Sequence, residues 1–126
     1  MSRNEAVNPQ GARPGLTFNQ GIKRGNILFI SGQLGNNPDG TFPPDIKTQC
    51  QLAYEKIGEI LRAAGATFDD VVKTTDFITT MEDYRDTAEV RREFFTNGFS
   101  AATGVVVKRL VRTAALIEVE AIAVVD

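Results

Sequence analysis

The 126-residue sequence contains no histidine and no tryptophan, and its only cysteine is Cys50. Without histidine the chain cannot use a Ser-His-Asp or Cys-His mechanism, and it lacks the commonest metal ligand. A single cysteine also excludes an internal disulfide and a thiolate zinc site. Any general acid or base must therefore be a carboxylic acid, a lysine, a tyrosine, a hydroxyl group or water.

Long apolar runs are missing too, because no stretch approaches the ~20 residues of a transmembrane helix. The first 15 residues lack the apolar run of a secretory signal, and a lone thiol suits a reducing compartment, so we expect a cytoplasmic protein without membrane contact. The net charge of −2 argues against a nucleic-acid partner, which normally requires a clustered basic surface.

The length allows one domain and no more. Residues 1–15 are polar and contain two prolines, which predicts a flexible or loosely docked N-terminal arm. Residues 16–126 show no repeat and no linker, so they are expected to form a single domain. A domain this small buries a modest fraction of its surface, and self-association would bury more.

One long helix is indicated by an apolar stripe that recurs at steps of three and four residues. Asp45 is a suitable N-cap for it, and Gly65 is a suitable residue just beyond its end. Because Cys50 lies on the stripe, we interpret it as a core residue and not as a nucleophile. The stripe consists of Ile46, Cys50, Ala53, Ile57, Ile60, Leu61 and Ala64.

The remaining pattern predicts five strands and a second helix. The helix follows a capping box near Thr79 or Thr80 and directs Tyr84, Ala88, Phe94 and Phe95 to the core. The order β-β-α-β-α-β-β predicts a two-layer α+β domain with both helices on one face of the sheet. We expect the last two strands to be joined by a turn at residues 112–115. The predicted strands cover residues 18–22, 27–31, 71–79, 104–110 and 116–125.

The last predicted strand has apolar residues on both faces. Leu116, Ile122 and Val124 share the face that the helices would leave open. An exposed apolar sheet face usually marks an interface, so we expect oligomerisation. That interface would partly bury Glu118 and Glu120.

Four segments in the same order resemble the reactive-intermediate deaminase family (Rid, also called YjgF). They are Phe-Asn-Gln-Gly at 18–21, Ile-Ser-Gly-Gln-Leu at 30–34, Val-Lys-Thr-Thr at 72–75 and Ile-Glu-Val-Glu-Ala-Ile-Ala at 117–123. The resemblance spans residues 16–125. It implies a chorismate-mutase-like fold with a mixed sheet, and a homotrimer whose sheets form a central barrel with three ligand clefts between subunits. In the family's best-known branch these clefts hydrolyse short-lived enamines and imines to 2-oxo acids and ammonia, without a metal or an organic cofactor.

The resemblance also implies which residues line the cleft. Phe18 matches a position that is often a tyrosine, and Ser31 and Gly32 match residues that contact the ligand. Glu118 matches the glutamate credited with positioning or activating the attacking water. From residue type alone, Glu118 is better explained as a strand carboxylate paired with Lys73, Lys108 or Arg109 on a neighbouring strand. Its family position makes the two interpretations about equal.

The chain departs from the family pattern after the second helix. The active branch has Pro-Ala-Arg-Ser-Cys there, and its arginine clamps the substrate carboxylate; this chain has Ser-Ala-Ala-Thr-Gly at 100–104, with Ala102 in place of the arginine and Gly104 in place of the cysteine. A methyl group cannot form the bidentate, charge-assisted hydrogen bonds of a guanidinium, a loss of roughly 2–5 kcal/mol for a partly buried carboxylate. Standard 2-iminobutanoate deaminase activity is therefore not expected without a substitute cation.

Two arginines are the candidates for that substitution. Arg109 lies seven residues past Ala102, so strand alternation places it on the opposite face. Arg112 lies in the predicted turn and would reach the site only if the turn folded inward.

Two main hypotheses of function remain. The first is a hydrolase for a small reactive imine or enamine, in which Glu118 is the general base or water-orienting group and Ser31, backbone amides and Thr103 hold the substrate. The second is a non-catalytic trimer that binds or senses a small metabolite in the same cleft. An endoribonuclease or translation inhibitor is a more remote alternative, since the chain has no histidine and no basic-aromatic stripe.

Overall fold

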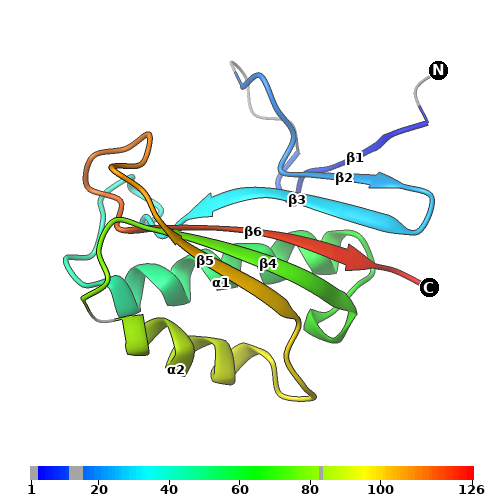
Figure 1. Ribbon diagram of the computed structural model, residues 1–126. Helices are drawn as coiled ribbons and strands as arrows, with labels where there is room; N and C mark the ends of the chain where they lie inside the picture. Colours follow the sequence, from blue (N-terminus) through cyan, green and yellow to red (C-terminus); the bar gives the residue numbers. More distant parts are fainter. Residues whose placement is uncertain (1–2, 12–15, 83) are drawn as a thin grey trace.

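A computed structural model describes residues 3–11, 16–82 and 84–126 of the chain. Six strands form one sheet, and both long helices cover the same face of it (Figure 1). This confirms the predicted two-layer α+β architecture with a mixed sheet. The elements are β1 (Glu5–Val7), β2 (Gly21–Arg24), β3 (Ile27–Leu34), α1 (Ile46–Ala63), a 3-10 turn (Phe68–Asp70), β4 (Val71–Ile78), α2 (Tyr84–Phe94), β5 (Ala101–Val106) and β6 (Ile117–Val124).

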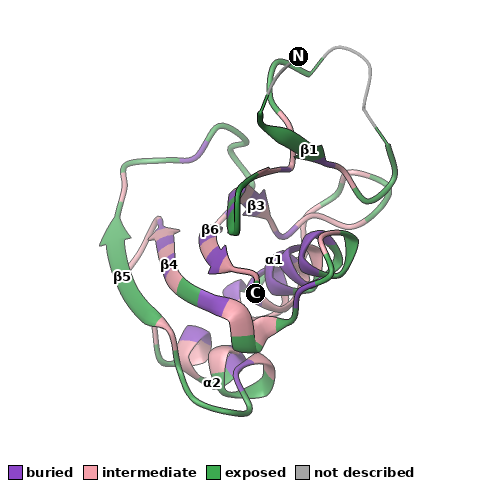
Figure 2. Cartoon of the chain, turned by 90° about the vertical axis from the view of Figure 1, so that its right-hand side faces the viewer, coloured by how far each residue is buried: buried purple, intermediate pink, exposed green. Residues whose placement is uncertain are grey.

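The strand order in the sheet is β1-β2-β3-β6-β4-β5. β6 pairs antiparallel with both β3 and β4, whereas β5 pairs parallel with β4. The expectation that the last two strands are joined by a turn is wrong, because β4 separates them and residues 107–116 form a longer crossover. The apolar character of both faces of β6 fits a central strand. All six residues of β5 are exposed, as befits an edge strand (Figure 2).

The segment expected to form an N-terminal arm contributes a strand to the sheet. Residues 5–7 form β1, which pairs antiparallel with β2, and Val7 is buried. The Asn8 side chain adds hydrogen bonds to the Asn19 side chain (3.0 Å) and from the Gln20 amide (2.9 Å). Residues 1–2 and 12–15 of the expected arm lie outside the described residues.

Helix α1 begins and ends where the sequence predicts. The Asp45 carboxylate accepts hydrogen bonds from the amide and the hydroxyl of Thr48, both at 2.8 Å. At the other end Gly65 adopts φ +75°, a left-handed conformation that glycine tolerates best. Cys50 is fully buried on the apolar stripe, which confirms its interpretation as a core residue.

Helix α2 packs against the sheet and α1 through most of the expected residues and two that were not expected. Thr87 and Val90 are fully buried, while Ala88 is only half-buried. Tyr84, Phe94 and Phe95 do pack against the core, as predicted. No helix among the described residues is long and apolar enough to cross a lipid bilayer.

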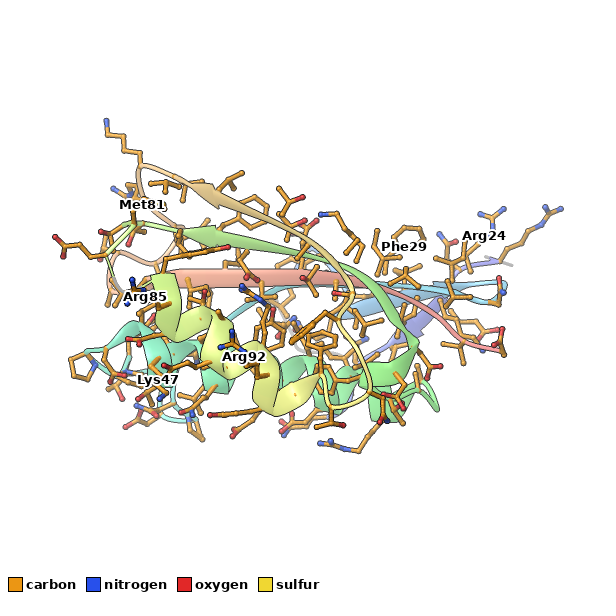
Figure 3. The ribbon with its side chains drawn as sticks, turned by 60° about the horizontal axis from the view of Figure 1, so that its bottom comes forward. Arg24, Phe29, Lys47, Met81, Arg85 and Arg92 are labelled. Atoms are coloured by element: carbon orange, nitrogen blue, oxygen red, sulfur yellow. The ribbon has the colours of Figure 1, made fainter. Side chains whose placement is uncertain are left out.

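The face of the sheet that the helices leave open carries large apolar side chains. Phe29 is 48% exposed and Val72 is 47% exposed, and Ile27 and Val105 are also exposed. Phe29 belongs to the sheet face opposite the helices, because it pairs directly with Ile122 of β6 (Figure 3). This apolar face matches the surface from which the sequence predicts self-association.

Candidate functional site

A β-bulge lies in the middle of β3. Between Ile30 and Gln33 the strand advances three residues, while β6 advances two, from Ala121 to Val119. The two residues at the bulge are Ser31 and Gly32. Bulges redirect side chains and are common beside active sites, so the predicted ligand-contacting pair occupies a local irregularity of the sheet.

The bulge brings Gly32 against Glu118 of β6. A Cβ atom on residue 32 would lie 2.7 Å from Cδ of Glu118 and 2.9 Å from its Cγ and Oε2. Only glycine leaves room for the carboxyl group at this point. The structure therefore joins two residues that are 86 positions apart in the sequence and that the resemblance assigns to one cleft.

The Glu118 carboxyl group is half-buried and makes no ion pair or hydrogen bond with another described residue. Its pKa is raised above the ordinary value, chiefly by burial and in addition by the charge of Glu120. Lys73, one of the cations considered as its partner, donates instead to Oγ1 of Thr103 at 2.7 Å and to the carbonyl of Thr74 at 3.0 Å. The carboxyl group is thus available to a ligand or water.

Ser31 ties the bulge to the loop that carries Phe18. The Ser31 hydroxyl donates to the carbonyl of Asn19 at 2.7 Å, and its amide donates to the carbonyl of Gln20 at 2.9 Å. Because the hydroxyl proton is engaged, the oxygen of Ser31 is left to accept a hydrogen bond from a ligand. Phe18, which precedes Asn19 in this loop, is 55% exposed.

The start of β6, and with it Glu118, is fixed by a buried glutamine of α1. The Gln49 side chain is fully buried and accepts a hydrogen bond from the amide of Leu116 at 2.7 Å. Its amide group donates to the carbonyls of Pro43 (2.8 Å) and Ala114 (3.1 Å). One side chain therefore holds the loop before α1 and the crossover before β6 in place.

The other two predicted site residues lie on β5, at the edge of the sheet. Thr103 belongs to the open face, since its hydroxyl contacts Lys73. Ala102 faces the helices and lines a hollow against α2. Neighbouring residues of a strand point to opposite faces, so Ala102 faces this hollow and Thr103 does not. Ala102 and Glu118 thus lie on opposite faces of the sheet within one chain.

The hollow beside Ala102 has a volume of about 210 Å³. Neither Arg109 nor Arg112, the two cations considered as substitutes, lines it. Arg112 turns to the loop before α1, where it donates to the carbonyl of Gly40 at 3.3 Å and lies over the Phe42 ring. The lining residues are Ala88, Arg91, Arg92, Phe95, Phe99, Ser100 and Ala102.

Sequence reasoning missed Arg91 and Arg92, the two arginines of α2 that line the hollow. Arg92 is four residues after Ala88 and three before Phe95. Arg91 is three residues after Ala88 and four before Phe95, so both arginines lie at helical spacing between these two apolar residues. This interruption of an apolar stripe was the available signal, and it does not distinguish one arginine from the other.

A buried ion pair anchors α2 beside the hollow. Arg91 donates to the carboxylate of Asp76 at 2.7 Å, and the Asp76 side chain is only 3% exposed. The Tyr54 hydroxyl also contacts this carboxylate at 3.2 Å. Burial raises the pKa of Asp76, although Arg91 and Tyr54 oppose that shift.

A second, larger cavity of about 340 Å³ lies between α1, the end of β3 and residues 9–11. Its polar lining includes Gln20, Gln33 and Lys56 but none of the predicted site residues. Among the described residues, no group of three or more Cys, Asp or Glu side chains could hold a metal ion.

Known proteins share both sequence and fold with this chain. The model of the family described as Endoribonuclease L-PSP matches residues 10–125. The chain is 33% identical to the 2-iminobutanoate/2-iminopropanoate deaminase of Mus musculus over 109 residues, which cover 85% of this chain and 80% of that protein. It is 40% identical to the RutC family protein YjgH of Escherichia coli (strain K12) over 80 residues, 63% of this chain and 61% of that protein.

Among solved structures, Escherichia coli TdcF with bound serine matches with a TM-score of 0.87 and 31% identity. The match covers 97% of this chain and 99% of TdcF. The agreement extends over the whole sheet and both helices, and it includes the chorismate-mutase-like arrangement that the sequence predicts. The chain therefore belongs to the Rid (YjgF, L-PSP) family.

Proposed function

We propose that the chain is a homotrimeric hydrolase that deaminates a small reactive imine or enamine in clefts between subunits. The observation that carries the proposal is the half-buried, unpaired carboxyl group of Glu118, packed against the Gly32 bulge. The deaminase named among its relatives supports this chemistry. Because Ala102 replaces the arginine of the active branch, we expect a substrate that is not held by a β5 guanidinium.

The division of the site between two faces of the sheet supports assembly from more than one copy of the chain, as the proposed trimer requires. Glu118 faces the open side of the sheet, whereas Ala102 faces α2 from the outermost strand. A cleft with both residues in its walls requires two copies of the chain. The exposed apolar side chains of the open face, Phe29 and Val72 among them, supply the surface for that contact.

The reaction needs only water and a proton carrier. In its ionised form Glu118 takes a proton from water as the water oxygen bonds to the carbon of the protonated imine, which gives a neutral carbinolamine. The protonated carboxyl group returns this proton to the amine nitrogen. The C–N bond then breaks as the carbinolamine hydroxyl gives its proton back to Glu118, so that a carbonyl compound and ammonia leave, and the ammonia takes up the last proton to form ammonium. A raised pKa suits a group that must both accept and return a proton near neutral pH.

The test supplies imines made in place by an amino-acid oxidase and times ammonia release. We expect the protein to accelerate the release, and Glu118→Gln to lower the rate by about 10²–10⁴-fold, the usual contribution of a general acid–base. Glu120→Gln is the matched control, since Glu120 lies two residues along the same face but is exposed and paired in register with Thr75. Its rate should stay near that of the wild type.

Equal ammonia release with and without the protein, across imines from acidic, apolar and polar amino acids, would reject the hydrolase. Retained ligand binding in that case would favour the metabolite-binding trimer. Loss of activity in Glu120→Gln as well as in Glu118→Gln would show that general surface charge, and not the Gly32-packed carboxyl group, controls the rate.

A further inference from the structure

The hollow between α2 and β5 is walled mostly by apolar groups. Phe95 and Phe99 form one side, with ring centroids 6.5 Å apart, and Ala88 and Ala102 contribute only methyl groups. Nothing longer than a methyl group extends from residue 102 into this space, so a ligand with a small apolar body fits there. The charges at its rim then decide which ligands it accepts.

The two arginines of the hollow differ in what they contact. Arg91 is neutralised by Asp76 at 2.7 Å, and its guanidinium also lies over the Tyr84 ring. Arg92 is exposed and makes no ion pair or hydrogen bond with any described residue. Figure 3 shows Arg92 extending from α2. One guanidinium of the hollow is therefore unpaired.

No carboxylate of α2 balances this charge. Glu89 is paired with Lys47 of α1 at 3.0 Å, and Glu93 accepts a hydrogen bond from Gln51 of α1 at 3.2 Å. These two side chains thus face α1, and Asp86, the third carboxylate of α2, contributes to the raised pKa of Lys47 of α1. None of the residues that line the hollow is acidic. The hollow has one uncompensated positive charge beside an apolar wall.

Resting on the proposed function, we infer that Arg92 is the anion-binding residue of the site, and that the substrate is an imine or enamine bearing a carboxylate. The guanidinium reaches the ligand from helix α2, so the strand position of Ala102 needs no cation. The carboxylate lies at Arg92, and the apolar part of the ligand packs against Phe95 and Phe99. Arg92 thereby determines specificity for acids over neutral molecules.

Equilibrium binding to the full-length protein tests the inference without catalysis. The probes are 2-oxobutanoate and its uncharged amide, titrated by calorimetry. We expect the wild type to bind the acid about 10–100-fold more tightly than the amide, the range for a charge-assisted hydrogen bond. Arg92→Gln should abolish this preference, and Arg92→Lys should retain part of it.

Arg85→Gln is the matched control. Arg85 is an exposed arginine of the same helix that does not line the hollow (Figure 3). Its removal should leave the preference for the acid unchanged. An equal loss in Arg85→Gln and Arg92→Gln, or no loss in either, would overturn the inference.

Kinetics with oxidase-generated imino acids separate this inference from the proposed function. If both hold, Arg92→Gln raises KM about 10-fold or more with little change in kcat, whereas Glu118→Gln lowers kcat. If the protein speeds ammonia release but Arg92→Gln leaves KM unchanged, the inference fails and the hydrolase stands. If no ammonia release is accelerated but only Arg92→Gln loses preference for the acid, the hydrolase fails and the anion site stands.

Discussion

The bulge of β3 and the hollow at β5, the two halves of the proposed site, have opposite character. The bulge lies inside the sheet, is held by hydrogen bonds that Ser31 donates to the carbonyls of Asn19 and Gln20, and lies against the carboxyl group of Glu118. The hollow lies at the sheet edge and presents the unpaired guanidinium of Arg92. Among the described residues, Glu118 and Arg92 each have no ion-pair partner, and their charges are of opposite sign.

This difference indicates that Glu118, the proposed general base, and Arg92, the proposed anion-binding residue, are held in place by different parts of the fold. Glu118 depends on the packing of β6 against Gly32, and the hollow depends on α2, which the Asp76–Arg91 pair fixes to β4. Substitutions should therefore damage one half and spare the other. The two halves act together only if copies of the chain meet.

The largest effect is expected from a substitution that prevents association of the subunits. Phe29→Lys places a charge on the apolar open face and should weaken each interface by about 3 kcal/mol, enough to release monomers at micromolar concentration. Light scattering gives the mass. Val111→Lys is the control, since Val111 is 83% exposed in the crossover before β6 and off the sheet face. A wild-type protein that is already a stable monomer contradicts the trimer.

Next in size is the loss of the anchor of α2. Asp76→Ala leaves the buried guanidinium of Arg91 uncompensated and should lower the free energy of unfolding by about 3 kcal/mol, the lower end of the range for broken buried pairs, because the Arg91 side chain is 16% exposed. Hydrogen exchange should speed up in α2 and β5 and change little in β3. Uniform acceleration across the sheet would show that the halves are not supported separately.

A smaller effect is expected at the bulge. Gly32→Ala forces the flexible end of Glu118 aside, so the rate of imine hydrolysis should fall about 10-fold, while the free energy of unfolding changes by less than about 1 kcal/mol. Gly35→Ala is the contrasting variant, because its Cβ would lie 2.0 Å from the backbone oxygen of Gln49. It should unfold the protein readily. Unchanged activity in Gly32→Ala would separate the bulge from the chemistry.

The smallest expected effect is on stability as a function of pH. Because burial and Glu120 raise the pKa of Glu118 in the folded state, ionisation of Glu118 costs the folded protein free energy. This cost is absent below the unfolded pKa of about 4.3 and complete above the raised folded pKa. Glu118→Gln should therefore match the wild type at pH 4 and be more stable at pH 8, by less than about 1 kcal/mol. Denaturant titrations at both values measure it.

The local elements of the fold were predictable from the sequence. The Asp45 cap, the apolar stripe and Gly65 define α1 through contacts within a few residues. The alternation of β6 predicted which side chains face the helices. The order of the strands was not predictable in the same way, since the parallel pairing of β5 with β4 depends on contacts between distant segments.

The candidate site was predictable only in part. The family resemblance named Gly32 and Glu118, but the bulge that brings them together has no short-range pattern in the sequence. Arg92 could not be identified because its spacing from Ala88 and Phe95 does not distinguish it from the adjacent Arg91. Only the pairing of Arg91 with Asp76, which requires the packed structure, separates one arginine from the other.

The hydrogen bonds of Gln49 have a consequence for how this fold can vary. Its side chain forms hydrogen bonds with the carbonyl of Pro43, three residues before α1, and with the amide of Leu116, one residue before β6. Because these two residues are held in place, we expect the loop before Pro43 and the crossover between β5 and Leu116 to tolerate changes in length without shifting the register of β6. The side-chain amide of Gln49, which has no role in the proposed reaction, thereby keeps Glu118 in position when the neighbouring loops gain or lose residues.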